Sequence, residues 1–218
     1  MNYLTHFLID GKQDRPYYNF GLILPDMVGV AKRGWKPAHT EALEASTGNT
    51  KEIWLGYQQH IARDALFHNT HLFSYNTKRI RKELEQAGLA QEGVRLFFVA
   101  HVLLEILIDR HIIKTRRYVA DRFYDTLAQI EEPEIRTFFD ASGTEMPERF
   151  LEFFGKFQTS RYLYGYADDD GIYFSINRLL HRTKQTTYET EANKKALGEL
   201  VQREERTLFD EIEQLLET

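Results

Sequence analysis

Histidine and aspartate residues recur at helical spacing in the first third of the chain. His60, Asp64 and His68 follow one another in steps of four, and His71 comes three residues later. A helix places residues three or four apart on one face, so we expect these four side chains to share a face. Imidazole and carboxylate groups arranged in this way can bind a divalent metal ion or transfer protons.

A second stretch repeats the four-residue step in more apolar surroundings. His101, Glu105 and Asp109 lie within residues 94–113. Most of the remaining positions in this stretch are hydrophobic. Buried polar groups of this kind cost several kcal/mol unless they are paired or bind a metal. A buried His–Glu hydrogen bond, or a polar face toward a water-filled groove, is the alternative interpretation. Two such faces on neighbouring long helices favour one shared metal site, with the His60 and Glu105 side chains converging.

Two further candidates come from the start of the chain. Asp26 follows Pro25 in an otherwise apolar run, and its alternative interpretation is a helix cap. His6 lies between apolar residues and could equally be a packed or solvated histidine. The chain has no cysteine, which excludes disulfides, thiolate zinc sites and a cysteine nucleophile. Imidazole and carboxylate ligands without thiolate suit manganese, iron, magnesium or zinc.

The elements that must position these residues read as helices. The 218 residues are 42% hydrophobic and 28% charged, which is typical of a globular protein. No stretch alternates like a strand. Residues 32–49 read as a loop with a short helix, and residues 86–93 as a connection. We predict an all-α, single-domain helical bundle over residues 1–218. The segments with helical periodicity are 53–75, 94–113, 118–130, 148–157, 172–180 and 191–216.

Charge and hydropathy exclude several classes of partner. The net charge of −5 does not suit a protein that binds a phosphate backbone, so we expect no nucleic acid partner. No run of 18 apolar residues is present, and the first residues lack the basic region of a signal peptide. We therefore expect no membrane span and a cytoplasmic location. Two basic clusters, 78–82 and 114–117, are interpreted as solvated helix ends or as docking patches for an acidic partner or a phosphate.

Several ordered blocks of the sequence resemble the acyl carrier protein phosphodiesterases. The match spans most of the chain, in order and at similar spacing. The blocks are Met1-Asn2-Tyr3-Leu4-x-His6, Gly21-Leu22-Ile23-Leu24-Pro25-Asp26 with Val28 and Gly34, Gly56-x-x-x-His60-x-x-x-Asp64, Leu103-Leu104-Glu105 with Leu107, Arg110 and His111, and Tyr166 with Ile172, Leu179 and Arg182.

The resemblance implies an all-helical fold related to the HD-domain phosphohydrolases. It implies release of 4′-phosphopantetheine from holo-acyl carrier protein, with manganese as the usual metal and the carrier protein as partner. Residue by residue, His60 and Asp64 match the histidine and aspartate of the long helix. Asp26 matches the early aspartate of the family, and His6 matches its early histidine.

This sequence departs from the family at three positions. His68 replaces an aspartate, and His101 and Glu105 replace two aspartates four residues apart. All three replacements can still bind metal, but they change the charge and softness of the site. The predicted metal ligands or orienting residues are Asp26, His60, Asp64, His101 and Glu105, and His6 or His68 would assist proton transfer.

Three alternatives to this function remain open from the sequence. The first is another HD-type hydrolase of a small phosphoester. The second is a carboxylate-bridged oxidative site, although the Glu-x-x-His spacing common in such bundles is missing. The third is a helical interaction protein without enzymatic activity, which would bind no metal.

Overall fold

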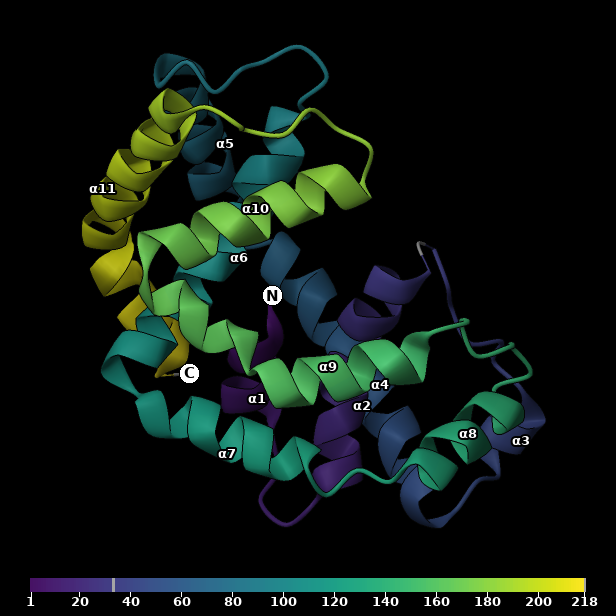
Figure 1. Cartoon of the computed structure of the whole chain (residues 1–218). Coiled ribbons are helices and arrows are strands. Elements are labelled where there is room, and N and C mark those ends of the chain that lie inside the picture. The colour runs from purple at the N-terminus through teal and green to yellow at the C-terminus, as the bar shows by residue number, and fades with distance from the viewer. Residues whose placement is uncertain (33, 218) are drawn as a thin grey trace. The chain divides into compact units, whose positions relative to one another are not determined.

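The described chain is built from helices. The computed structural model describes residues 1–32 and 34–217, and no strand occurs within those two ranges (Figure 1). The all-α prediction is confirmed, whereas the likeness to HD domains stays a prediction. The helices are α1 (Tyr3–Asp10), α2 (Pro16–Ala31), α3 (Glu41–Glu44), α4 (Gly48–His68), α5 (His71–Gln86), α6 (Leu96–Thr115), α7 (Arg117–Leu127), α8 (Glu132–Ala141), α9 (Phe150–Ser160), the 3₁₀ helix η1 (Tyr162–Ala167), α10 (Asp169–Arg182) and α11 (Glu191–Leu216).

The prediction of a single helix over residues 53–75 is wrong. Helix α4 ends at His68, and a second helix, α5, begins at His71. Thr70 is the N-cap of α5, and its hydroxyl oxygen accepts a hydrogen bond from the Phe73 backbone N–H at 3.1 Å. A capping threonine satisfies a backbone donor that a continuous helix would bond internally. His71 therefore begins α5 and does not share the α4 face that carries His60 and Asp64.

Helix α2 contains an internal proline. Pro16 stands at its first turn, where a proline ring is tolerated, but Pro25 lies in its interior. Pro25 has no N–H, so the helix lacks one internal hydrogen bond at this turn. Asp26 lies directly after this proline and inside the helix, so its alternative interpretation as a helix cap is wrong.

The chain divides into two units, each assembled from two separate segments. Unit 1 comprises residues 1–65 and 118–162, and unit 2 comprises residues 66–117 and 163–218. The prediction of a single domain stays a prediction. The abundant aromatic residues form much of the unit 1 core, where Phe123 packs edge-on against Phe7 and Phe157. Phe20 packs in the same way on Phe154. Such offset contacts add to the stabilisation from burial.

Helices α2 and α4 of unit 1 meet through two glycines. A β-carbon on Gly21 would lie 2.2 Å from the Ile53 carbonyl oxygen, and one on Gly56 would lie 2.0 Å from the Tyr18 carbonyl oxygen. These separations are far below van der Waals contact, so only glycine fits at either position. The two backbones approach each other more closely here than side chains would permit.

Unit 2 is organised around α6, which contacts α5, α10 and α11. Figure 1 shows α11 running beside α5 and α10. The apolar character of residues 94–113 agrees with the burial of α6, in which Leu103, Leu104 and Ile108 are fully buried. None of the helices in the described ranges is long and apolar enough to cross a membrane.

A charged pair is buried between α5 and α11. Glu204 of α11 is 2% exposed, and its carboxylate lies 2.7 Å from the Arg79 guanidinium of α5. Arg79 also donates to the Asn76 side-chain oxygen at 2.9 Å. Burial raises the pKa of Glu204 above its ordinary value, against the opposing charge of Arg79.

The glycine contact predicts a large difference between two kinds of Gly→Ala substitution. Gly21→Ala and Gly56→Ala should each destabilise the protein by about 1–3 kcal/mol or more, because the added methyl meets backbone. Gly29→Ala is the control, since its β-carbon would enter open space on the same α2 helix. It should stabilise by about 0.5–1 kcal/mol. Urea unfolding measures both effects, and equal effects at Gly21 and Gly29 would contradict the close contact.

The buried Glu204 predicts a pH dependence of stability. An unfolded glutamate ionises near pH 4.5, whereas the folded protein holds the Glu204 proton to a higher pH. Above pH 4.5 the folded state therefore binds more protons and loses stability as the pH rises. The unfolding free energy of Glu204→Gln, measured relative to the parent, should rise between pH 4.5 and 7. A relative value that falls over this range would contradict the burial effect.

Candidate metal centre

Four of the predicted site residues come together in unit 1. His6 of α1, Asp26 of α2 and His60 of α4 each offer one ligand atom, and these atoms lie within 4.8 Å of one another. The His6 and His60 rings stack with their centroids 4.0 Å apart. Asp64 lies one turn beyond His60, with Oδ2 3.5 Å from the His60 Nε2 atom. We refer to His6, Asp26, His60 and Asp64 as the unit 1 cluster.

The backbone of α2 fixes the orientation of His60. Its Nδ1–H donates to the Leu22 carbonyl oxygen at 2.7 Å. A carbonyl only accepts, so the proton is on Nδ1 and the Nε2 atom faces the carboxylates. Nε2 lies 3.9 Å from the Asp26 Oδ1 atom. Leu22 directly follows Gly21, so the close approach of α2 and α4 sets this hydrogen bond. Metal-binding histidines commonly have their other nitrogen held in this way.

Asp64 connects several positively polarised groups. Its Oδ1 atom accepts from the His6 Nε2–H at 3.1 Å and from the Met1 amino group at 2.6 Å. Burial raises the pKa of Asp64, but the hydrogen bonds from His6 and His60 outweigh burial and hold this pKa well below its usual range. Asp64 is thus an anion already occupied by partners. Its position suits orienting the imidazoles better than binding an ion directly.

His6 has a buried nitrogen without a partner. Its side chain is fully buried, and no described group hydrogen-bonds to its Nδ1 atom. Since Nε2–H donates to Asp64, Nδ1 carries a lone pair. Burial lowers the pKa of His6 to about 4, so the ring is neutral at pH 7. A neutral imidazole with an unused lone pair, beside a second imidazole and a carboxylate, fits a divalent transition metal ion.

His60 and Asp26 differ in charge and exposure. Burial lowers the pKa of His60, but the charges of Asp26 and Asp64 outweigh it and leave this pKa above its ordinary value. The Asp26 side chain is 33% exposed, whereas that of His60 is 3% exposed. The Asp64 side chain is 24% exposed, so solvent reaches the cluster at its two carboxylates.

The remaining predicted ligands form a second group in unit 2. His68, at the end of α4, meets His101 and Glu105 of α6, with one ligand atom of each within 4.8 Å of the others. The predicted ligands thus gather in two groups, one in each unit, and convergence of His60 and Glu105 stays a prediction. His71 stacks on Tyr75 and belongs to neither group.

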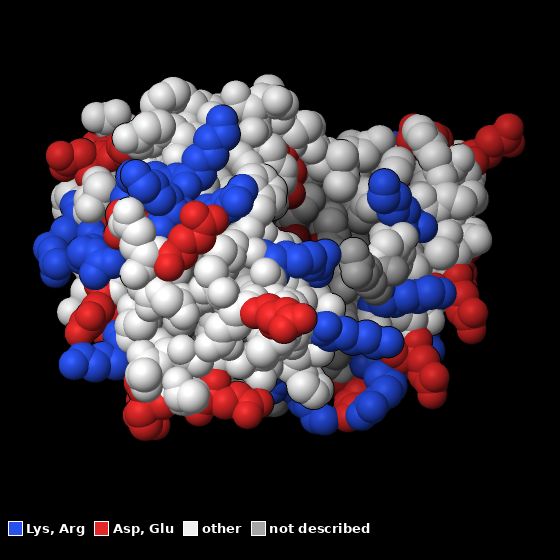
Figure 2. Space-filling view, turned by 90° about the horizontal axis from the view of Figure 1, so that it is seen from above, with Lys and Arg blue, Asp and Glu red and all other residues white. Residues whose placement is uncertain are grey.

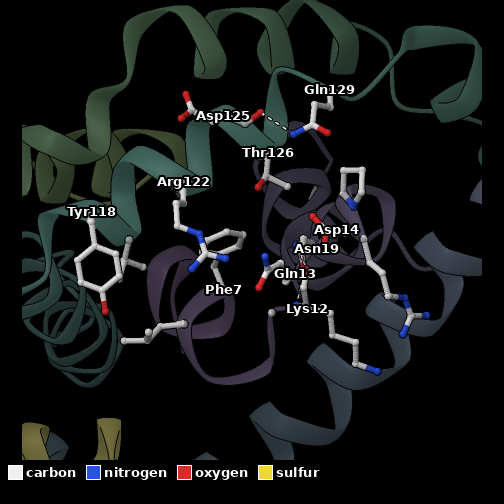
Figure 3. A pocket seen from close by; sticks show the side chains of 15 residues that line it. Phe7, Lys12, Gln13, Asp14, Asn19, Tyr118, Arg122, Asp125, Thr126 and Gln129 are labelled. Atoms are coloured by element: carbon white, nitrogen blue, oxygen red, sulfur yellow. Dashed lines mark hydrogen bonds between the residues drawn. The ribbon is translucent and has the colours of Figure 1, made fainter.

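A pocket of about 420 Å³ lies elsewhere in unit 1, between the segment after α1 and helix α7. Asn19 shapes this segment by exchanging two 2.8 Å hydrogen bonds with the backbone of Lys12. Figure 3 shows the Arg122 side chain pointing into the pocket. No member of the unit 1 cluster lines it, so we assign the pocket no part in metal binding.

The two predicted basic clusters differ in availability. In the second, Lys114 pairs with Glu205 at 2.5 Å and Arg116 pairs with Glu213 at 2.5 Å, as expected for a charged helix end. In the first, Arg79 is held by Glu204, but Lys78 and Lys82 are exposed and make no ion pair with the described residues. Figure 2 shows basic and acidic side chains mixed over one face.

Two groups that position the cluster had no direct signal in the sequence. These are the Leu22 carbonyl, which is a backbone atom, and the amino group of Met1. The glycines of the helix crossing were detectable, because an isolated glycine inside a helical pattern often has a packing reason.

Comparison with known proteins does not assign the chain to a family. No protein-family model, no curated protein and no solved structure matches the chain. The resemblance to acyl carrier protein phosphodiesterases accordingly rests on the residues quoted from the sequence.

Proposed function

We propose that this protein is a metal-dependent phosphodiesterase. The observation that supports the proposal most is the convergence of His6, Asp26 and His60, together with the unpartnered buried Nδ1 atom of His6. A divalent ion held by these residues, manganese by the resemblance, would polarise a phosphoryl oxygen and lower the pKa of a bound water. This chemistry is that of phosphoester hydrolysis.

In this proposal the residues of the unit 1 cluster have different roles. Asp26, as the most exposed member, faces the side from which a substrate phosphate would arrive. His6 serves as a ligand and not as a proton donor, since its pKa of about 4 keeps it neutral at pH 7. Asp64 is a positioning residue that accepts a hydrogen bond from the His6 Nε2 atom and lies 3.5 Å from the His60 Nε2 atom. Leu22 fixes the tautomer of His60.

We propose holo-acyl carrier protein as the substrate class, on the resemblance in the sequence. The carrier proteins of this reaction are acidic, and the protein itself carries a net charge of −5. Any electrostatic attraction must therefore be local. Lys78 and Lys82, one turn apart on α5 and free of ion pairs with the described residues, are the best candidates for it.

Removal of Asp26 tests the metal site. Asp26→Asn should lose the metal ion and hydrolysis of bis(p-nitrophenyl) phosphate together, measured by elemental analysis and by initial rates with added Mn²⁺. Asp64→Asn should weaken metal binding by about 10–100-fold, as expected for a residue that orients ligands. Asp140→Asn, at an exposed position of α8, and His39→Gln, 66% exposed, are controls that should keep both properties. Full metal content and full turnover in Asp26→Asn would refute the proposal.

Charge reversal tests the protein substrate. Lys78→Glu/Lys82→Glu should raise KM for holo-acyl carrier protein several-fold at low salt while leaving kcat nearly unchanged, and added salt should reduce the difference. Lys156→Glu, a charge reversal at a 72% exposed position of α9, is the control. Unchanged KM in the double variant would contradict this docking patch. Hydrolysis of a small phosphodiester should be the same in all three proteins.

A further inference from the structure

The second group of predicted ligands has the geometry of a metal site of its own. The His68 Nε2 and His101 Nε2 atoms lie 3.4 and 2.9 Å from the same carboxylate oxygen, Oε1 of Glu105. The two imidazole centroids are 4.9 Å apart, and the rings are nearly perpendicular. All three residues belong to unit 2, so the group is complete within one unit.

These separations match those between ligands on one metal ion. Nitrogen and oxygen ligands at about 2.0–2.1 Å from zinc stand about 3.3–3.4 Å apart in tetrahedral geometry and about 2.9 Å apart at a right angle. The distances from His68 and His101 to Glu105 fall at these two values. An ion could therefore enter with small movements of the three side chains.

The surrounding structure holds the imidazoles in place. Both rings contact the buried Phe73 ring, with centroids 4.6 Å from His68 and 4.8 Å from His101. Phe73 is held by the Thr70 cap that begins α5, two residues after α4 ends at His68. Glu105 lies on α6 among residues that are almost fully buried. The break between α4 and α5 thus determines where the His68 side chain lies.

The exposure of the three side chains suits an ion with open coordination positions. Glu105 is 13% exposed, whereas His68 is 34% and His101 is 27% exposed. Water or a substrate can therefore reach the nitrogen side of the group. Two imidazoles and one carboxylate with open positions are typical of catalytic zinc and of non-haem iron(II) sites.

We propose that His68, His101 and Glu105 bind a second divalent ion, Zn²⁺ or Fe²⁺, independently of the unit 1 cluster. Nitrogen ligands outnumber carboxylates here, which favours these ions over Mg²⁺. The proposal does not depend on the phosphodiesterase function, because it rests on unit 2 residues alone. The alternative is a metal-free arrangement in which Glu105 accepts a hydrogen bond from each imidazole.

Zinc titration of single and double variants tests the second site. After treatment with EDTA, the full chain should bind two equivalents of Zn²⁺ by calorimetry. Asp26→Asn should bind one equivalent, and so should His101→Gln. The double variant Asp26→Asn/His101→Gln should bind neither equivalent of Zn²⁺. His71→Gln, which removes a neighbouring histidine outside the group, should retain two equivalents.

The result of Asp26→Asn separates a second site from a shared one. Loss of all zinc in Asp26→Asn and again in His101→Gln would mean one shared site and overturn the proposal. Two equivalents retained in His101→Gln would also overturn it. Glu105→Gln keeps the side-chain shape, and its circular dichroism reports folding. It should weaken the second equivalent by more than about tenfold. A negative result for the second site does not affect the test of the phosphodiesterase proposal. That test measures metal content and hydrolysis in Asp26→Asn.

Discussion

The contact between Gly21 and Gly56 is the constraint on which the unit 1 cluster depends. Helices that pack through side chains keep their axes about 8–10 Å apart. The two glycines bring backbone against backbone instead. This closeness brings the His60 side chain of α4 to the Leu22 carbonyl of α2. Asp26, one turn after Leu22, is thereby placed beside the same imidazole.

Both groups use the same electrostatic arrangement. In each, one carboxylate lies between two imidazoles: Asp64 between His6 and His60, and Glu105 between His68 and His101. The carboxylate compensates the polar nitrogens that the core would otherwise disfavour, and in unit 1 a second carboxylate, that of Asp26, adds to it. The groups differ in access. The unit 1 imidazoles are at most 3% exposed, whereas those of unit 2 are 27% and 34% exposed. Water therefore reaches the first group at its carboxylates, Asp26 and Asp64, and reaches the second group at its imidazoles.

The sequence predicted the helical class and the identity of the clustered residues better than the element boundaries. The helical periodicity of residues 94–113 and 191–216 was sufficient to predict α6 and α11, because it follows from the local side-chain pattern. The sequence did not predict the break between α4 and α5 at Thr70, because the helical periodicity continues on both sides of it. The break depends on a single capping hydroxyl, that of Thr70. The inclusion of Asp26 in a helix was also missed, because Pro25 normally indicates a helix end. The division of the ligands into two groups follows from tertiary contacts, which periodicity does not contain.

The interleaved connectivity of the two units has a consequence for how the chain is made. Residues 1–65 carry every member of the unit 1 cluster, but the α7 and α9 aromatics that cover α1 and α2 follow only after residue 117. A nascent chain emerging from the ribosome must therefore keep the apolar faces of its first helices uncovered while the first segment of unit 2 is translated. Neither unit can close before residue 162 has been synthesised, so maturation of the two units is obligatorily late and coupled in time.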